Sequence, residues 1–432
     1  MNRQSDVIEN WEYGLLTLLN NALNLPVSEK NDAIEVKSII EDVSRKLDSD
    51  SIQKFNEYSE DEWNKIIKTA DGHGVLPLIA DELYFMDCVP DNIKIKAVAK
   101  AKKIVIQNSR LSYLTNEYMS ILNDAGITAV LLKGAGTAAY YPVKSLRKSG
   151  DIDILIPDKL QFDKAVSVLE LHGVVIMGEQ HAWHHVEMHN ENGVIIELHR
   201  ALAEQFDDDD VNKKIEQYTE EMSVHNILKN IDGMNIVCPE MAWEALSLAI
   251  HMLHHFVRAG FGLKLLCDWV VFWNSEHDES QKNTFYSMIS SIGITGFVKA
   301  VNIICIKYLG MKKENVFFMI QDEKTEVNTD IFLKDIIEAQ EFGSTKDERM
   351  VVLRGSRFAD YVREFHHQMK LNNPDKKDNK LLWPYLWVKT FAVFVRNNRT
   401  VRKTTIRSVL KSAGARSRVA YDMKLFKKYY PK

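Results

Sequence analysis

Two aspartates lie one residue apart in an otherwise apolar stretch, Asp151-Ile152-Asp153-Ile154-Leu155-Ile156. Because side chains alternate along a strand, Asp151 and Asp153 share one face and the isoleucines take the other. Burying acids is unfavourable unless a cation pairs with them. Two carboxylates about 4 Å apart repel by roughly 4 kcal/mol at an effective dielectric near 20. Since Mg²⁺ prefers carboxylate oxygens and phosphates as ligands, the stretch predicts a metal site on a strand.

A turn that contains two glycines precedes the paired acids. We expect a strand over residues 127–132 to end in Lys133-Gly134-Ala135-Gly136, and a short helix to run from Thr137 to Tyr141. Glycine lets the backbone approach a ligand closely, and the start of a helix directs free N–H groups at an anion. The Lys133 ammonium is expected to meet a phosphate. Turn, helix and acids together predict a site for a metal-chelated nucleoside triphosphate.

A third acid follows on a later stretch with strand alternation. Residues 194–198 and 183–188 are expected to form a hairpin around the Asn192-Gly193 turn. Glu197 shares a face with His199, which is expected to touch a phosphate or a metal-bound water. Arg147, in the polar loop before the paired acids, is expected to contact the triphosphate with its planar fork, and a solvated loop cation is the alternative.

In this order, the G-x-G-T turn, the D-x-D strand and the later acid resemble the nucleotidyltransferase core of the DNA polymerase beta superfamily. More narrowly, the chain resembles a bacterial family of uncharacterised nucleotidyltransferases through Leu132-Lys133-Gly134, Ser145-Leu146-Arg147, Asp151-Ile152-Asp153 and Glu197-Leu198-His199. The resemblance extends over residues 10–275. Glu197 stands where the superfamily usually has Asp, and Thr137 where it more often has Ser.

The residues and the resemblance together imply an enzyme that moves a nucleoside monophosphate from a nucleoside triphosphate to a hydroxyl acceptor. Mg²⁺ is the expected cofactor in a two-metal site, with Mn²⁺ as the alternative ion. The expected catalytic and metal-binding residues are Asp151, Asp153 and Glu197. The expected nucleotide contacts are Lys133, Gly134, Gly136, Thr137, Arg147 and His199. The sequence leaves open the acceptor, the nucleotide base and the alternative of a non-catalytic nucleotide-binding scaffold.

The order of elements predicts the fold class. Strand, helix, strand, helix and hairpin over residues 126–205 suit a small mixed sheet with helices on one side. Apolar residues at helical spacing dominate on both sides of this core. We therefore expect an α+β protein with four parts: an N-terminal helical region (1–125), the nucleotidyltransferase core (126–205), a helical domain (206–374) and a basic C-terminal helical segment (375–432).

The N-terminal region contains one clear start signal and one histidine that needs an explanation. Ser59, followed by Glu62, is typical of a capping box, and residues 34–47 predict a further helix. A single helix or two shorter ones are expected over residues 93–122. His73 is expected to cap the helix before it, with a functional role as the alternative.

Several histidines outside the acidic strands leave a second metal site open. His251 and His255 are four residues apart and share a face of a predicted helix, as metal ligands can. The favoured alternative is that His254 pairs with Asp268 across two packed helices. Two interpretations are open for the histidines in and beside the predicted hairpin: polar positions on a half-exposed hairpin, or metal ligands. These histidines are His181, His184, His185 and His189.

Composition and charge narrow the class of protein. The 432 residues are 45% hydrophobic and 27% charged, and the four cysteines show no C-x-x-C spacing. This argues against a zinc ribbon or a disulfide framework, and it favours a cytoplasmic protein. Residues 375–432 hold 16 Lys/Arg against 3 Asp/Glu, whereas the first 374 residues carry a net −18. The basic segment predicts packing on the acidic body, or contact with an anionic membrane or a nucleic acid. The oligomeric state stays open.

Overall fold

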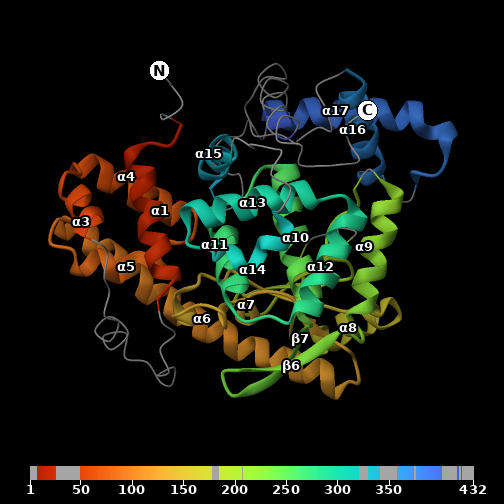
Figure 1. Cartoon of the computed structure of the whole chain (residues 1–432). Helices are drawn as coiled ribbons and strands as arrows, with labels where there is room; N and C mark the ends of the chain where they lie inside the picture. The colour runs from red at the N-terminus through yellow and green to blue at the C-terminus, as the bar shows by residue number, and fades with distance from the viewer. Residues whose placement is uncertain are drawn as a thin grey trace.

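The computed structural model of the chain describes residues 7–25, 49–177, 184–206, 208–320, 329–340, 358–373, 376–400, 416–417 and 420. The helix expected over residues 34–47, His181 and most of the basic segment beyond residue 400 lie outside the described residues. In the described part, a five-stranded mixed sheet and a two-stranded sheet lie among helices (Figure 1). The predicted α+β class, a small mixed sheet flanked by helical regions, is confirmed.

The N-terminal helices form because their apolar residues recur at helical spacing and their ends are capped. The Ser59–Glu62 capping box is present, with each side chain bonded to the other residue's backbone N–H. His73 follows this helix and is fully buried; its Nε2 lies 2.9 Å from the Ile337 carbonyl, and its Nδ1 accepts the Leu263 N–H at 3.0 Å. The helices are α1 (Asn10–Leu23), α3 (Ser49–Asn56), α4 (Glu60–Gly72) and α5 (Leu76–Phe85).

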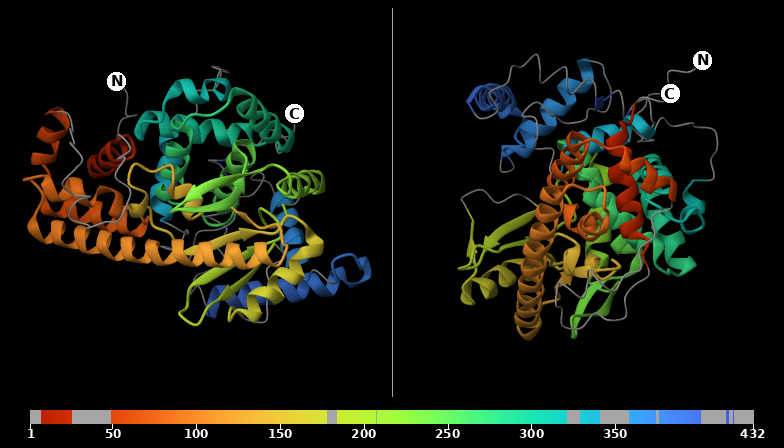
Figure 2. Two further views of the ribbon diagram at one scale, coloured as in Figure 1. Left: turned by 90° about the horizontal axis from the view of Figure 1, so that it is seen from below. Right: turned by 90° about the vertical axis from the view of Figure 1, so that its left-hand side faces the viewer.

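One long helix, α6 (Asp91–Asp124), connects the N-terminal helices to the sheet (Figure 2). The sequence left one helix or two open, and the structure has one. Ile93 and Ala97, in its first half, belong to the same buried cluster as the N-terminal helices. Leu114 and Leu122, in its second half, pack against the sheet. The helix therefore spans both apolar clusters of the molecule.

The five-stranded sheet has the order β1-β2-β5-β4-β3. Strand β2 runs parallel to β5, and the other neighbours are antiparallel. The strands are β1 (Val130–Leu131), β2 (Asp151–Leu155), β3 (Val175–Ile176), β4 (His185–His189) and β5 (Ile195–His199). The intervening helices are α7 (Ala135–Ala138), the 3-10 turn η1 (Lys144–Leu146) and α8 (Lys159–Leu171).

Alternation gives this sheet two chemically different faces. The apolar face packs against α6 and α8 through Ile152, Ile154, Ile196 and Leu198. Asp158 caps helix α8 by accepting the Leu160 N–H. The opposite face carries Asp151, Asp153, Glu197 and His199. Since α6 and α8 pack on the apolar face, the acidic face is open to contact with other elements.

A second small sheet was not expected. After α9 (Asp209–Glu221), strands β6 (Asn226–Ile231) and β7 (Met234–Pro239) form a hairpin, where the sequence analysis predicted only helices. Its turn residues Asp232 and Gly233 both have positive φ, as a two-residue hairpin turn requires. The Asp-Gly pair was the local signal that could have identified the hairpin.

Helices α10 and α11 cover the acidic face, and both contribute residues to the larger core. Trp63 of α4 and Trp269 of α11 are fully buried in one apolar cluster, so the N-terminal helices and the helices after residue 240 share a core. Helix α6 contributes to both clusters. The division of the chain into four parts stays a prediction. The helices are α10 (Met241–Arg258), α11 (Leu263–Asn274), α12 (Glu279–Ile292), α13 (Thr295–Tyr308), α14 (Lys313–Val316), η2 (Phe317–Met319), α15 (Thr329–Ala339), α16 (Phe358–Leu371), η4 (Lys380–Leu382) and α17 (Trp383–Thr400).

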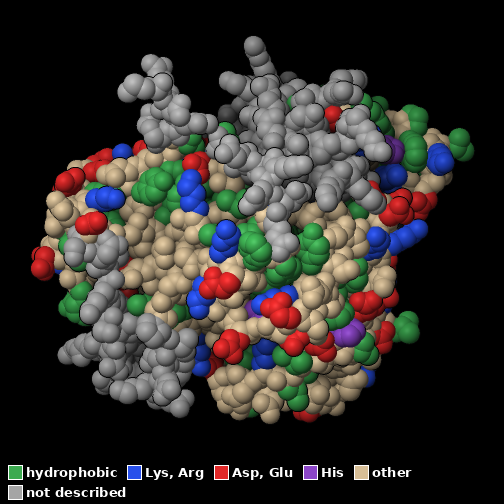
Figure 3. Space-filling view, in the orientation of Figure 1, with side chains coloured by type: hydrophobic (Ala, Val, Ile, Leu, Met, Phe, Trp, Pro, Cys, Tyr) green, Lys and Arg blue, Asp and Glu red, His purple; other side chains and the backbone are tan. Residues whose placement is uncertain are grey.

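The described surface is mixed in character. On the face shown in Figure 3, basic and acidic side chains lie interspersed over the described elements. Of the helices described, none is both long enough and apolar enough to span a bilayer.

Candidate active site

The three acids expected from the sequence converge on one face of the sheet. Strands β2 and β5 are parallel neighbours, and their register pairs Asp153 with Glu197. Asp151 lies on the same face, one pleat away. Each of the three carboxylates offers an oxygen within 4.8 Å of the others, so the trio could hold a metal ion. Strand pairing alone produces this convergence.

A cavity of about 250 Å³ opens above the acids, between the sheet and helices α10 and α11. Of the residues expected at the site, Lys133, Gly134, Arg147 and His199 line it together with the three acids. Gly134 has φ 67° and ψ −116°, a conformation that favours glycine. The helical wall contains Ser247, His251, His254, His255, Lys264 and Leu265.

Lys133 supplies positive charge inside this cavity. Its Nζ lies 3.0 Å from Asp153 Oδ1 and 3.2 Å from His251 Nδ1, and 13% of its side chain is exposed. Burial alone would lower the pKa of Lys133, but the three nearby carboxylates raise it above its ordinary value. Burial and the nearby ammonium hold the pKa of His251 well below its ordinary value. A neutral His251 can therefore accept a hydrogen bond from Lys133.

His199 is the second internal cation. Its Nε2 lies 3.0 Å from Asp153 Oδ1 and 3.2 Å from Glu197 Oε2. Burial opposes its protonation, but these hydrogen bonds raise the pKa of His199 to about 9. Burial would raise the pKa of Asp153, yet Lys133 and His199 lower it below the ordinary value. Asp153 is thus an ionised carboxylate held between two cations.

The other two acids have different environments. The charge of Asp153, followed by burial, raises the pKa of Asp151 to about 6. Burial would raise the pKa of Glu197, but the hydrogen bond from His199 lowers it. Asp151 therefore carries most of the unrelieved repulsion, and an added cation would relieve it first.

The comparisons with known proteins agree with this geometry. A protein-family model described as "Uncharacterised nucleotidyltransferase" matches residues 59–310, which is more than half of the chain. The chain belongs to this nucleotidyltransferase family. The matched span contains the whole five-stranded sheet and the helices α10 and α11 that cover its acidic face. No curated protein and no solved structure matches the chain.

Two of the expected nucleotide contacts in this nucleotidyltransferase lie away from the cavity. Gly136 and Thr137 are buried within α7 and are not among the residues that line it. The helix begins at Ala135, two residues earlier than expected, and it is only four residues long. The hydroxyl of Thr137 is buried without a hydrogen-bond partner among the described protein atoms.

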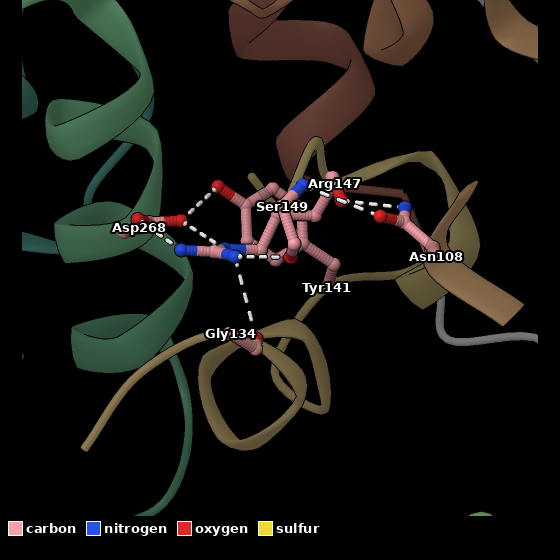
Figure 4. Close-up of polar contacts among 6 residues, drawn as sticks. All are labelled: Asn108, Gly134, Tyr141, Arg147, Ser149 and Asp268. Atoms are coloured by element: carbon pink, nitrogen blue, oxygen red, sulfur yellow. Dashed lines mark hydrogen bonds and ion pairs between the residues drawn. The ribbon is translucent and has the colours of Figure 1, made fainter. Parts of the chain in front are cut away.

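Arg147 lines the cavity, but its donors are committed to protein acceptors (Figure 4). Nε and Nη2 form a bidentate pair with the two oxygens of Asp268 at 2.7 and 2.8 Å. Nη1 donates to Ser149 Oγ at 2.9 Å and to the Gly134 carbonyl at 3.3 Å. Arg147 is 4% exposed and Asp268 1% exposed. The expected phosphate contact would require Arg147 to leave a buried ion pair.

The expected pair between His254 and Asp268 is wrong. Asp268 receives Arg147, and the Tyr141 hydroxyl donates to the same carboxylate at 2.6 Å. His254 instead lies 4.0 Å from Glu204 Oε2. The partner of Asp268, Arg147, comes from the loop before β2. Asn108 of α6 fixes this loop beside α11 by donating to the Arg147 carbonyl at 2.7 Å (Figure 4).

Sequence reasoning missed two lysines of the cavity wall, Lys148 and Lys264. Lys148 directly follows Arg147 in the same polar loop, so its position could have been included. Lys264 lies at the start of α11, and no local pattern connects that helix to the sheet. Both add positive charge to the cavity that contains the three carboxylates.

The buried pair predicts a large effect of Arg147→Met on stability. Removing the guanidinium leaves the Asp268 carboxylate buried, with the Tyr141 hydroxyl as its remaining donor among the described residues, which should lower the free energy of unfolding by about 3–5 kcal/mol. Urea unfolding followed by tryptophan fluorescence measures this loss. The exposed Arg110→Met on α6 is the matched control, and the double variant Arg147→Met/Asp268→Leu should recover part of the loss. Equal unfolding free energies for the two single variants would contradict the structural role.

The crowding of carboxylates predicts a pH-dependent effect of Asp151→Asn in EDTA. A pKa raised from 3.8 to about 6 means that the folded chain binds this proton more tightly than the unfolded chain. The resulting stability is full below about pH 4 and is lost as the pH rises through about 6. Relative to the wild type, the variant should therefore become progressively more stable between pH 4 and 7, as measured by urea unfolding. An equal gain in the exposed control Asp163→Asn would contradict this explanation.

Proposed function

We propose that this nucleotidyltransferase moves a nucleoside monophosphate from a nucleoside triphosphate to a hydroxyl acceptor at Asp151, Asp153 and Glu197. The observation that carries the proposal is the convergence of three carboxylates and Lys133 in one cavity, in a chain of this family. A D-x-D strand parallel to a strand with a third acid also supports a place in the DNA polymerase beta superfamily. The acceptor and the base of the nucleotide are outside this proposal.

The donor set fits a hard divalent cation. Three carboxylates within 4.8 Å of one another are the oxygen ligands that Mg²⁺ and Mn²⁺ accept. When bound, such an ion would neutralise the triphosphate and polarise the reacting oxygens. Asp151 and Asp153 are the residues we assign to the ion that chelates the triphosphate. Glu197 is the third ligand, on the neighbouring strand.

The cations of the site have a place in the same proposal. Lys133 and His199 provide the positive charge beside Asp153, and Lys148 and Lys264 extend it along the cavity. We assign Lys133 and His199 to the phosphates, since both are one hydrogen bond away from the carboxylate that would receive the cation. Arg147, bound to Asp268, is in this proposal a positioning residue that fixes the loop before β2.

The transfer exchanges a phosphoanhydride bond of the triphosphate for a phosphoester bond to the acceptor. The acceptor oxygen attacks the α-phosphorus, the bond from that phosphorus to the bridging oxygen breaks, and pyrophosphate leaves. The acceptor's proton goes to a carboxylate. Glu197 is our choice of base, because 24% of its side chain is exposed, whereas 3% of Asp153 is exposed and that residue is already bound by two cations.

The proposal is tested by incubation with each α-labelled nucleoside triphosphate, Mg²⁺ and a cell extract, followed by mass analysis of small-molecule, protein and RNA fractions. We expect labelled product and pyrophosphate from the wild type, and a loss of at least about a hundredfold in Asp151→Asn. Asp151→Asn is preferred to Asp153→Asn, because the latter also leaves Lys133 without its ion pair.

The exposed variant Asp163→Asn is the control for this experiment. Equal pyrophosphate release by wild type and Asp151→Asn would overturn the assignment of the acids. Mg²⁺-dependent binding of a triphosphate without transfer to any fraction would favour the alternative, a non-catalytic nucleotide-binding protein.

Glu197→Gln should separate chemistry from binding. If Glu197 takes the acceptor's proton, the substitution lowers kcat by about a hundredfold or more, the usual range for a general base. Nucleotide affinity should change little, because Asp151 and Asp153 still hold the triphosphate-bound ion. Pyrophosphate release gives kcat, and equilibrium titration gives the affinity. Glu187, which lies opposite Glu197 on β4, is the matched control; a loss in Glu187→Gln alone would transfer the role to that residue.

A further inference from the structure

The imidazoles beside the carboxylates form a donor set of a different kind. We propose that His185, Glu197 and His199 make a second cation position, which binds a divalent transition metal of the Zn²⁺ or Co²⁺ type next to the Mg²⁺ position. The two positions share Glu197, and an ion here would occupy the ring nitrogen of His199 that is otherwise open to a phosphate. Metal binding here does not depend on the proposed transfer reaction, although its role would be part of that reaction.

Strand pairing places the three ligands together. His185 and His199 are directly opposite each other on the antiparallel strands β4 and β5. Glu197 lies two residues before His199, on the same face. One ligand atom from each residue lies within 4.8 Å of the others. A rigid sheet, rather than a loop, therefore positions the set.

The distance between the two rings fits a shared ion. The ring centres of His185 and His199 are 5.4 Å apart. Two imidazoles on one tetrahedral ion, each with a metal–nitrogen bond of about 2.0–2.1 Å, place their ring centres about 5 Å apart. To share one ion with the two imidazoles, the Glu197 carboxylate would leave Nε2 of His199 and turn toward Nδ1.

Unpartnered ring nitrogens are an independent observation at the same place. Nδ1 of His185 and Nδ1 of His199 are buried without a hydrogen-bond partner among the described protein atoms, and His199 is 6% exposed. A buried polar atom left unpaired costs about 1–3 kcal/mol, so it calls for an explanation. Nε2 of His199 lies 3.0 Å from Asp153 Oδ1 and donates to it, since a carboxylate only accepts. A carboxylate on one ring nitrogen and a ligand on the other is the usual arrangement of a metal-binding histidine.

The chemistry of the donors selects the ion. Imidazole suits zinc, cobalt and related metals, whereas a purely carboxylate set suits Mg²⁺ and Mn²⁺. When the ion binds, His199 releases the proton on Nδ1 to solvent, and two divalent cations together with Lys133 then exceed the charge of the three carboxylates. We therefore expect a single transition-metal ion to bind without nucleotide, and both positions to fill only when the triphosphate adds its negative charge.

The test uses the full chain, free of any oligohistidine tag and stripped of metal, with one equivalent of Co²⁺ and no nucleotide. Proton NMR should show two exchangeable, paramagnetically shifted imidazole N–H resonances, one for each ligating histidine, and Zn²⁺ should displace them. In His185→Gln, one resonance should disappear and the affinity for Co²⁺ should fall at least about tenfold. His189→Gln, on the same strand but outside the cavity lining, is the matched control and should retain both resonances.

Asp151→Asn separates the two positions, because it removes a ligand of the carboxylate trio only. Retention of both resonances in this variant supports the proposal. No imidazole resonances in the wild type, an unchanged spectrum in His185→Gln, or equal loss in His185→Gln and Asp151→Asn would overturn it. Nucleotide transfer without imidazole ligation would leave the proposed function intact and remove only this site; Co²⁺ ligation without transfer would do the reverse.

Discussion

The mutual repulsion of three carboxylates is the constraint on which the rest of the site depends. Two adjacent strands bring Asp151, Asp153 and Glu197 together, and neither strand can move without breaking the sheet. The chain offsets the repulsion with an ammonium and an imidazolium, from Lys133 and His199, and both bind Asp153. Among the described residues no cation contacts Asp151 directly, and the charge of Asp153 holds its proton more tightly. In the metal-free protein the charge of Asp153 is therefore neutralised by its two partners, whereas the charge of Asp151 still meets repulsion. A bound cation would stabilise the site by removing that repulsion.

A second buried ion pair holds the covering helices in place over this site. Arg147 and Asp268 connect the loop before β2 to α11, and Asn108 of α6 binds the same loop from below (Figure 4). Buried pairs add little net stability compared with apolar contacts, but they tolerate few alternative arrangements. The pair therefore fixes where α11 and its Lys264 lie relative to the acids. Arg147 contributes to the site by connecting the loop before β2 to α11. Direct phosphate binding would require it to leave Asp268 and would break that connection.

The sequence predicted the parts of this arrangement that depend on local spacing. Alternation predicted which side chains share a face within β2 and within β5, and the resemblance to the nucleotidyltransferase family implied that Glu197 joins the two aspartates. The partner of Arg147 could not be predicted, since Asp268 lies 121 residues away and no pattern in either segment refers to the other. The same holds for the wall of α10 and α11, because the packing of a helix on a sheet is decided by the whole core. The β6–β7 hairpin is different, because its Asp-Gly turn is a local signal from which a hairpin could have been predicted.

The glutamate at position 197 connects the acids to the histidines in a way that an aspartate would not. Its backbone is paired with Asp153 on one side and with Glu187 on the other, so it lies between the D-x-D strand and the strand of His185. A carboxylate that belongs to both possible ligand groups must reach in two directions from one point on the sheet. The extra methylene of glutamate supplies that reach, whereas the shorter aspartate would stay close to its own strand. In our proposal the departure from the usual aspartate is thus a consequence of the imidazoles: where a histidine pair accompanies the acids, the shared ligand has to be the longer one.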